Sequence, residues 1–270
     1  ATIFDARGKA LTASESVVPR FAARAEQQVV FTWPEPIAKT VRSCEVPTDV
    51  LLLLDRSGSM ATDGGNPPEP LESAKRAAAQ FTARLKDKDQ AGYLSYATTP
   101  TTPLEQALTK RRELVEQAIH ATTLGTDGVQ YTNIGDAIRM AAAELVSSRH
   151  NADARKILVL LTDGDVTRPV NPANGKADRA YATQYALDAA AEAKAQDVSI
   201  YTIGLGNVVS DEGLGVDRDV ALIQNMATGP EYYHVAPSAA DLSRVYQEIS
   251  TALCEEGAAV IDIVPKIPIR

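Results

Sequence analysis

The side chains in this sequence that are best suited to chemistry carry oxygen, and they occupy three short motifs. Asp55 directly follows the apolar segment 51–54, and Ser57 and Ser59 come two and four positions later. Asp163 follows a second apolar segment, and Thr132 precedes a helix-like segment. Because ligands of open α/β sheets bind beyond the carboxyl ends of the strands, these residues are predicted to converge on one crevice.

Three hydroxyls and two carboxylates offer only oxygen ligands. Such ligands suit hard cations, of which Mg²⁺ is the first candidate and Mn²⁺ or Ca²⁺ the alternatives, and they disfavour zinc. The two carboxylates nearly balance a divalent charge. Mg²⁺ gives up water reluctantly, so hydroxyl ligands with water-bridged carboxylates leave an ion electrophilic and short of one ligand. The motifs therefore predict a divalent-cation site with one open position.

The elements that must position these residues alternate between strand-like and helix-like from about residue 49 to residue 254. This alternation predicts an α/β fold, doubly wound, with a mostly parallel sheet and helices on both faces. The predicted strands are 49–54, 91–96, 156–161, 198–205 and 231–235, with a weaker antiparallel edge over 102–108. The predicted helices are 71–85, 111–120, 133–148, 181–196, 219–227 and 239–254, the last with Ser238 as its N-cap.

The two ends of the chain have a different character. Short strand-like runs at 2–4, 28–32 and 258–264 lie between turn signals and lack a helical period. We expect a β-rich flank or stalk piece over 1–45, a main domain over 46–256, and a strand-like segment over 257–270 that pairs with the first flank. The first strand and the last helix of such a layer meet below the sheet, so both flanks should meet there.

Composition narrows the class of partner. The 270 residues, of which 44% are apolar, suffice for one large domain with or without a small one. Asp and Glu number 35 against 27 Lys and Arg, a net charge of −8, and no basic run is present. A nucleic-acid backbone would be repelled, so nucleic acid is not an expected partner.

The sequence has neither a membrane-length apolar run nor an apolar leader at its start. No run approaches the ~20 apolar residues that a membrane helix needs. The chain begins at Ala1 without a charged-then-apolar segment, which is typical of a mature or trimmed fragment. We therefore predict no transmembrane segment in this chain.

The oxygen-bearing motifs resemble the metal-ion-dependent adhesion site of the von Willebrand factor type A family. The resemblance covers roughly residues 46–254 and leaves both flanks out. The matching positions are Asp55, Ser57, Ser59, Thr132 and Asp163. It implies the hydroxyls as direct or switching ligands, the carboxylates as ligands mainly through water, and a free position for an acidic residue of a partner. The implied function is adhesion or protein binding.

A plainer interpretation of the first motif is that Ser57, Gly58 and Ser59 only form a turn and cap a helix, as such residues often do. The matching contexts of Thr132 and Asp163 favour the metal site, because agreement among separate motifs is unexpected for a simple cap.

Catalytic alternatives lack their motifs. Phosphatases with an aspartyl nucleophile resemble Asp-x-Asp, but Ser57 occupies the third position here. The Gly-x-Ser-x-Gly elbow, a phosphate-binding glycine loop and a dinucleotide fingerprint are also missing. Only His120, His150 and His234 could serve as a general base, and each falls within or beside an ordinary helix or strand. A histidine in such a position is more often solvated or packed than catalytic. We predict a protein that is not an enzyme, with a metal-dependent hydrolase as the less favoured alternative.

Two cysteines bear on location. Cys44 precedes the first strand of the main domain and Cys254 ends its last helix, and the topology puts both below the sheet. Lone cysteines are often buried thiols, but two expected neighbours favour a disulfide. A disulfide indicates an oxidising compartment, hence an extracellular or cell-surface protein. An intracellular metal-dependent assembly factor, the alternative, would keep both thiols reduced.

The partner expected from these features is a protein or extracellular-matrix ligand that offers a carboxylate. Alanine-rich helices and an inserted main domain resemble bacterial surface and pilus-associated proteins. The acidic stretch 211–219 is a weaker Ca²⁺ candidate, and a solvated loop is favoured because calcium-loop spacing is absent. The glycine- and proline-rich stretch 62–69 is expected to form a surface loop that rims the site.

Overall fold

The computed structural model describes residues 2–4, 10–13, 46–61, 68–124, 131–163, 166–205 and 216–253. The chain divides into two units, Ala1–Thr40 and Val41–Arg270. In the first unit, β1 (Thr2–Phe4) and β2 (Ala10–Ala13) form an antiparallel pair. The strand-like runs predicted at 28–32 and 258–264 lie outside the described residues.

A six-stranded sheet forms the centre of the second unit, in the order β5-β4-β3-β6-β7-β8. Every neighbouring pair is parallel except β4 with β5, the antiparallel edge that the sequence predicted. The strands are β3 (Thr48–Asp55), β4 (Gln90–Tyr96), β5 (Gln106–Thr109), β6 (Arg155–Thr162), β7 (Val198–Leu205) and β8 (Tyr233–Ala236). The predicted doubly wound α/β fold is confirmed.

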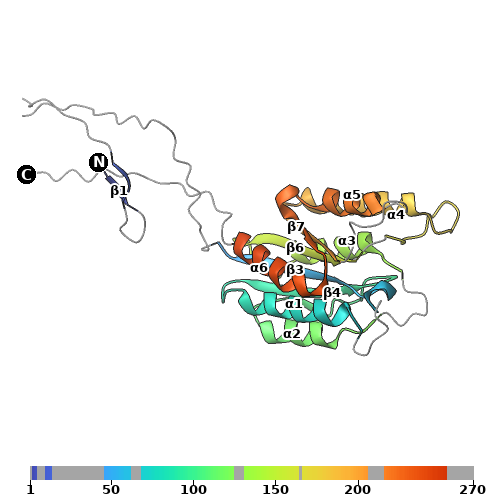
Figure 1. Ribbon diagram of the computed structural model, residues 1–270, viewed down its shortest axis with the longest axis horizontal. Coiled ribbons are helices and arrows are strands. Elements are labelled where there is room, and N and C mark those ends of the chain that lie inside the picture. The colour runs from blue at the N-terminus through green and yellow to red at the C-terminus, as the bar shows by residue number, and fades with distance from the viewer. Residues whose placement is uncertain are drawn as a thin grey trace, which may run out of the picture. The chain divides into compact units, whose positions relative to one another are not determined.

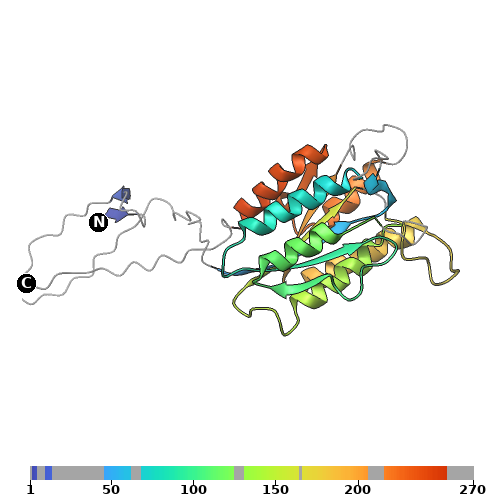
Figure 2. The same cartoon turned by 90° about the horizontal axis from the view of Figure 1, so that it is seen from below.

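Helices cover both faces of this sheet (Figure 1). One face is covered by α1 (Leu71–Arg84), α2 (Arg112–Ala121) and α6 (Leu242–Ala252). The other is covered by α3 (Ile134–Leu145), α4 (Arg179–Lys194) and α5 (Val216–Met226). Figure 2 shows α6 in red, α1 in cyan and α2 in green side by side, in agreement with the packing of α1 against both neighbours.

The sheet is buried on both sides because its strands are apolar at successive positions. On β3, Leu52 and Leu54 face the cluster beneath α1 and α6, whereas Leu51 and Leu53 face the cluster beneath α3 and α4. Each leucine is at most 1% exposed. Full burial of one such side chain contributes about 1.5–3 kcal/mol, so this central strand stabilises both layers.

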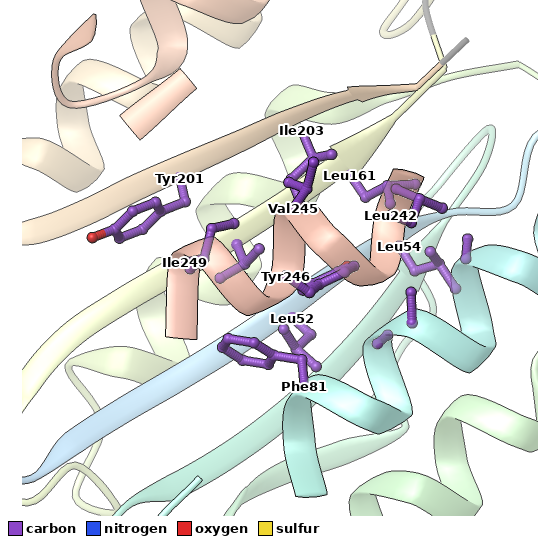
Figure 3. Close-up of a cluster of buried hydrophobic side chains, with 14 of the residues drawn as sticks. Leu52, Leu54, Phe81, Leu161, Tyr201, Ile203, Leu242, Val245, Tyr246 and Ile249 are labelled. Atoms are coloured by element: carbon purple, nitrogen blue, oxygen red, sulfur yellow. The ribbon is translucent and has the colours of Figure 1, made fainter. Parts of the chain in front are cut away.

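The last helix is fixed to the sheet by its apolar face. Val245 and Ile249 point towards the strands, and Tyr246 lies over Phe81 of α1 (Figure 3). The Phe81 and Tyr246 ring centroids are 5.4 Å apart, within the range of favourable aromatic pairs. Ser238 begins the segment as predicted, and its backbone N–H and hydroxyl both donate to Asp241.

Several predicted boundaries shift. Helix α5 begins at Val216, three residues before the prediction, so part of the acidic stretch is helical and not a loop. The 3₁₀ helix η2 (Pro230–Tyr232) takes the first part of the predicted strand 231–235, and β8 starts at Tyr233. A proline at the first helical position favours a helical turn, which explains this difference. Another 3₁₀ turn, η3 (Ala239–Asp241), precedes α6.

The described chain enters and leaves this unit at the amino-terminal end of the strands. Val46, Thr48 and Leu253 line one small pocket. The Arg155 guanidinium at the start of β6 donates to the Leu253 carbonyl. The segments next to both flanks therefore meet at this end, whereas Cys44 and Cys254 themselves lie outside the described residues. Within the described ranges, no helix has the length and apolar character needed to cross a bilayer.

Candidate metal centre

The candidate site lies where the order of the sheet reverses. The chain passes from β3 outward to β4 on one side, and β6 pairs with β3 on the other. Leu54 lies beside Leu161 in this register, so Asp55 and Asp163 leave adjacent strands at the same edge. Side chains at such a switch point face an open crevice, because the loops on either side diverge.

Asp55 is completely buried and is held by two hydrogen bonds. The Ser57 backbone N–H donates to its Oδ1 at 2.9 Å. The Thr162 hydroxyl, from the end of β6, donates to its Oδ2 at 2.9 Å. These bonds fix the carboxylate plane between the loop that follows β3 and the neighbouring strand.

The two serines continue this arrangement towards β6. The Ser57 and Ser59 Oγ atoms are 3.0 Å apart, and Ser59 Oγ donates to Asp163 Oδ1 at 2.8 Å. Ser57 is buried and Ser59 is exposed, so the row of oxygens runs from the interior to the surface. Among the described residues, the recorded hydroxyl bonds of both serines stay within this row, which differs from the helix-capping interpretation.

Thr132 lies at the same edge of the sheet, immediately before α3, and is buried. Its backbone N–H donates to the Thr167 hydroxyl oxygen at 2.9 Å, and its carbonyl accepts from the Thr167 and Arg168 N–H groups. The next residue, Asn133, donates its N–H to the Ala97 carbonyl beyond β4. Thr132 is thus fixed by its backbone, and no recorded hydrogen bond joins its hydroxyl to the other four residues in the described part of the chain.

Both carboxyl groups hold their protons more tightly than usual. Burial, reinforced by repulsion from Asp163, raises the pKa of Asp55 to about 7. Burial also raises the pKa of Asp163. No ion pair to either group is recorded among the described residues, so ionising both leaves two negative charges close together.

A hard divalent cation fits these residues. Two carboxylates and a row of hydroxyl oxygens form a donor set that such ions prefer, and the pair of acids supplies the compensating charge. No group of three or more His, Cys, Asp or Glu residues gathers as a possible metal site in the described ranges. An ion at this edge would therefore depend on the hydroxyls as well as on the acids.

Sequence reasoning missed the residues that hold the predicted ligands in place. Thr162 bonds to Asp55, and Thr167 bonds to the backbone of Thr132. The Tyr96 hydroxyl, fully buried at the end of β4, donates to the Leu161 carbonyl at 3.0 Å. A hydroxyl residue at the end of an otherwise apolar strand was the available signal for Thr162, because a buried hydroxyl needs a partner.

Two of the three histidines have partners away from the candidate metal centre. His150 Nδ1 lies 2.8 Å from Asp49 at the opposite end of the sheet, and His234 Nδ1 lies 3.8 Å from Glu248 of α6. His120 is exposed in the last turn of α2. Residues 62–67 of the predicted rim and residues 211–215 of the acidic stretch lie outside the described residues.

Comparison with known sequences gives a family match over most of the chain. The model for the von Willebrand factor type A domain matches residues 49–248. A UPF0353 protein of Mycobacterium avium is 31% identical over 209 residues, which cover 73% of this chain and 58% of that protein. A UPF0353 protein of Mycobacterium tuberculosis is 31% identical over 212 residues, with 74% and 58% covered. The match thus spans less than two thirds of these relatives' length.

Solved structures share the fold. The vWF domain of the type V pili tip protein Mfa5 from Porphyromonas gingivalis has a TM-score of 0.62 at 16% identity, covering 81% of this chain and 98% of that one. Proximal thread matrix protein 1 from the mussel byssus, described with a zinc-occupied MIDAS motif, has a TM-score of 0.60 at 20% identity, covering 78% and 48%. The pilus adhesin SpaC from Lactobacillus rhamnosus GG, in its open conformation, has a TM-score of 0.60 at 15% identity, covering 78% and 30%.

Proposed function

The chain belongs to the von Willebrand factor type A domain family, and we propose that its α/β unit is a metal-dependent protein-binding module. The proposed metal-binding residues are Asp55, Ser57, Ser59, Thr132 and Asp163. A carboxylate from a protein or extracellular-matrix partner completes the coordination. The module binds and does not catalyse.

The row of oxygens from Asp55 to Asp163 is the observation that carries this proposal. Ser57, Ser59 and Asp163 are linked by contacts of 3.0 and 2.8 Å across the ends of two adjacent strands. Such spacing suits side chains that can turn from one another towards a shared cation. Repulsion between Asp55 and Asp163 adds a reason to take up positive charge there.

The charged and the neutral residues of the proposed site have different roles. The Asp55 and Asp163 carboxylates supply the negative charge, and Asp55 is held firmly by Ser57 and Thr162. The neutral hydroxyls add oxygen without cancelling more charge. When bound, a divalent cation supplies an electrophilic centre at the exposed edge, and an incoming carboxylate brings the site closer to neutrality. Mg²⁺ is the proposed ion, with Mn²⁺ or Ca²⁺ as alternatives.

Titration calorimetry with Mg²⁺, Mn²⁺, Ca²⁺ and Zn²⁺ tests the site. We expect one dominant site in the wild type, and an affinity loss of roughly 100-fold or more in Asp55→Ala and Asp163→Ala, because each removes half of the compensating charge. Asp153→Ala removes the same charge from an exposed position near the start of β6 and serves as the matched control. Equal metal affinity in the wild type and Asp55→Ala would place the site elsewhere.

Partner binding needs its own test. Proteins captured by the wild type in Mg²⁺ should be released by chelator and should not bind Ser59→Ala or Thr132→Ala. A captured partner that binds these variants with full affinity in excess chelator contradicts the proposed role of the metal.

We also propose an extracellular or cell-surface location of bacterial type and a bridge between Cys44 and Cys254. The similar structures include a pilus tip protein and a pilus adhesin, and Val46 and Leu253, each within two residues of a cysteine, line one pocket. We propose that 1–45 and 257–270 form a β-rich flank around the domain at 46–256. Mass spectrometry of the natively produced protein tests the bridge, and two free thiols would favour the reduced, intracellular alternative.

A further inference from the structure

A pocket of about 390 Å³ with both polar and apolar walls adjoins the candidate metal centre on the β4 side of β3. Its walls come from the end of β4, from the loop that leads to β5, and from the last turn of α2. Its polar lining residues are Arg56, Ser95, Thr101, Glu105, Thr122 and Thr123. Arg56 is the residue that directly follows Asp55, so pocket and metal centre share one loop.

Arg56 is the positive group of this pocket. Its backbone N–H donates to the Tyr96 carbonyl at 2.9 Å, which fixes its position at the end of the sheet. Its side chain is half-buried, and in the described chain its guanidinium has no recorded hydrogen bond or ion pair. Other arginines have ion-pair partners: Arg139 pairs with Glu192, and Arg149 pairs with Glu144.

Most of the other polar groups of the pocket already have hydrogen-bond partners. Glu105 accepts from the Ser95 N–H at 3.0 Å and from the Ser95 hydroxyl. The Thr101 and Ser95 hydroxyl oxygens are 3.2 Å apart, and the Thr122 hydroxyl lies 2.8 Å from the buried Tyr93 hydroxyl. The acceptors of the walls are thus engaged internally, which leaves the guanidinium donors of Arg56 available to a ligand.

We propose that the Arg56 pocket is a second anion subsite, which takes a second carboxylate from the segment that binds at the metal centre. The partner segment is accordingly an acidic peptide with two carboxylate side chains. This inference rests on the proposed function for its first carboxylate. A guanidinium binds a carboxylate through two parallel N–H bonds, and partial burial strengthens that bond relative to one in bulk water.

The geometry favours a spacing of a few residues between the two acidic groups. The Cα atoms of Asp55 and Arg56 are about 3.8 Å apart, but the alternation along β3 directs their side chains to opposite faces of the sheet. A peptide that reaches both subsites therefore passes over the end of β3. When both carboxylates belong to one peptide, binding of the second becomes intramolecular once the first is bound, and this raises the affinity of the peptide.

Capped peptides that carry Asp, one to three glycines and then Glu test this inference against matched peptides with Gln in place of Glu. Binding is measured in Mg²⁺ by nuclear magnetic resonance titration of the whole chain. We expect the Glu peptide of the best spacing to bind the wild type roughly tenfold more tightly than its Gln counterpart. Arg56→Gln should abolish this difference, and Arg56→Lys should keep part of it because the charge remains without the planar fork.

Arg111→Gln is the matched control, because it removes the same charge at the other end of α2. Metal affinity should not fall in Arg56→Gln, which separates this subsite from the metal centre. If the wild type binds no metal, the proposed function fails, and the Glu peptide must still shift the Arg56 guanidinium signal more than the Gln peptide does in chelator. Equal binding of the Glu and Gln peptides, with metal and without it, overturns the inference.

Discussion

Strand β3 carries a buried carboxylate at each end, and the surroundings of the two differ. Asp49 and Asp55 are both 0% exposed. At the amino-terminal or lower end, Asp49 accepts from the Asn151 N–H at 2.7 Å and from Gln90, and it lies 2.8 Å from His150 Nδ1. At the carboxyl-terminal or upper end, Asp55 accepts hydrogen bonds from Ser57 and Thr162 and faces the like charge of Asp163.

The difference separates a structural carboxylate from one held ready for a ligand. A buried carboxylate whose hydrogen bonds come from several elements ties those elements together. A buried carboxylate next to another acid destabilises the fold until positive charge or protons arrive. Asp49 at the lower end of β3 thus stabilises the fold without a ligand, whereas Asp55 at the upper end lowers stability until a cation binds.

Removing the lower carboxylate should have the largest effect. Asp49→Ala leaves the Asn151 N–H, Gln90 and His150 without their acceptor, and we expect a loss of about 3 kcal/mol in the free energy of unfolding. Asp55→Asn keeps the shape of the upper group and removes its buried negative charge beside Asp163, so it should raise stability at pH 8 without metal. Urea denaturation of both variants measures this contrast, and equal losses would remove it.

A bound cation should offset the loss of stability that the Asp55 and Asp163 carboxylates cause. With the free cation at about 100 times its dissociation constant, the wild type should gain roughly 2.7 kcal/mol, because the ion binds the folded state. Asp55→Asn should gain far less, and Asp153→Ala should gain as much as the wild type. Thermal denaturation with and without Mg²⁺ tests this prediction. A gain in Asp55→Asn that equals the wild-type gain would contradict it.

The pH should matter at the upper end in the metal-free protein. The folded-state pKa of Asp55 is raised from 3.8 to about 7, so the folded state keeps a proton that the unfolded state releases. Stability from this group is greatest at low pH and falls as pH rises through that window, by about 1 kcal/mol between pH 6 and 7. The difference between wild type and Asp55→Asn isolates this term from the histidines, and a difference independent of pH would disprove it.

Thr162→Val should have the smallest effect. The variant removes the hydroxyl that donates to Asp55 Oδ2, so the ionised carboxylate loses one bond and stability falls by about 0.5–1 kcal/mol at pH 8. At pH 5 the loss should shrink, because Asp55 is then mostly protonated. Denaturation of the metal-free variant at both pH values provides the measurement, and a loss that grows towards pH 5 would assign Thr162 a different role.

The apolar pattern was sufficient to predict the layers. The run at 51–54 is buried on both faces, as a central parallel strand requires, and the antiparallel edge at β5 also follows the prediction. Boundaries shifted where local turn chemistry competed with apolar periodicity. Pro230 begins a 3₁₀ turn inside a predicted strand, and α5 starts at Val216 within an acidic stretch.

The predicted site residues were brought to one edge, but their supports were not predicted. Asp55, Ser57, Ser59 and Asp163 are linked by hydrogen bonds, because the strands before them are neighbours. The contact of Thr162 with Asp55 depends on the register between β3 and β6. That register is a property of the assembled sheet and has no local signal in the sequence. The pocket beside Arg56 depends in the same way on the packing of α2 beside β4.

Val46 and Leu253, the first and last described residues of the domain, lie together at the amino-terminal end of the strands, and this determines how the domain carries mechanical load. A partner pulling at the upper end of β3 and β6 draws against attachment points next to Val46 and Leu253, so the force runs along the strands. The hydrogen bonds between β3 and its neighbours lie across that direction and share the load in shear. We expect the unit to resist pulling along the strands better than pulling across the sheet. Single-molecule force spectroscopy would measure this difference, with one set of handles placed along the strands and a second set placed across them.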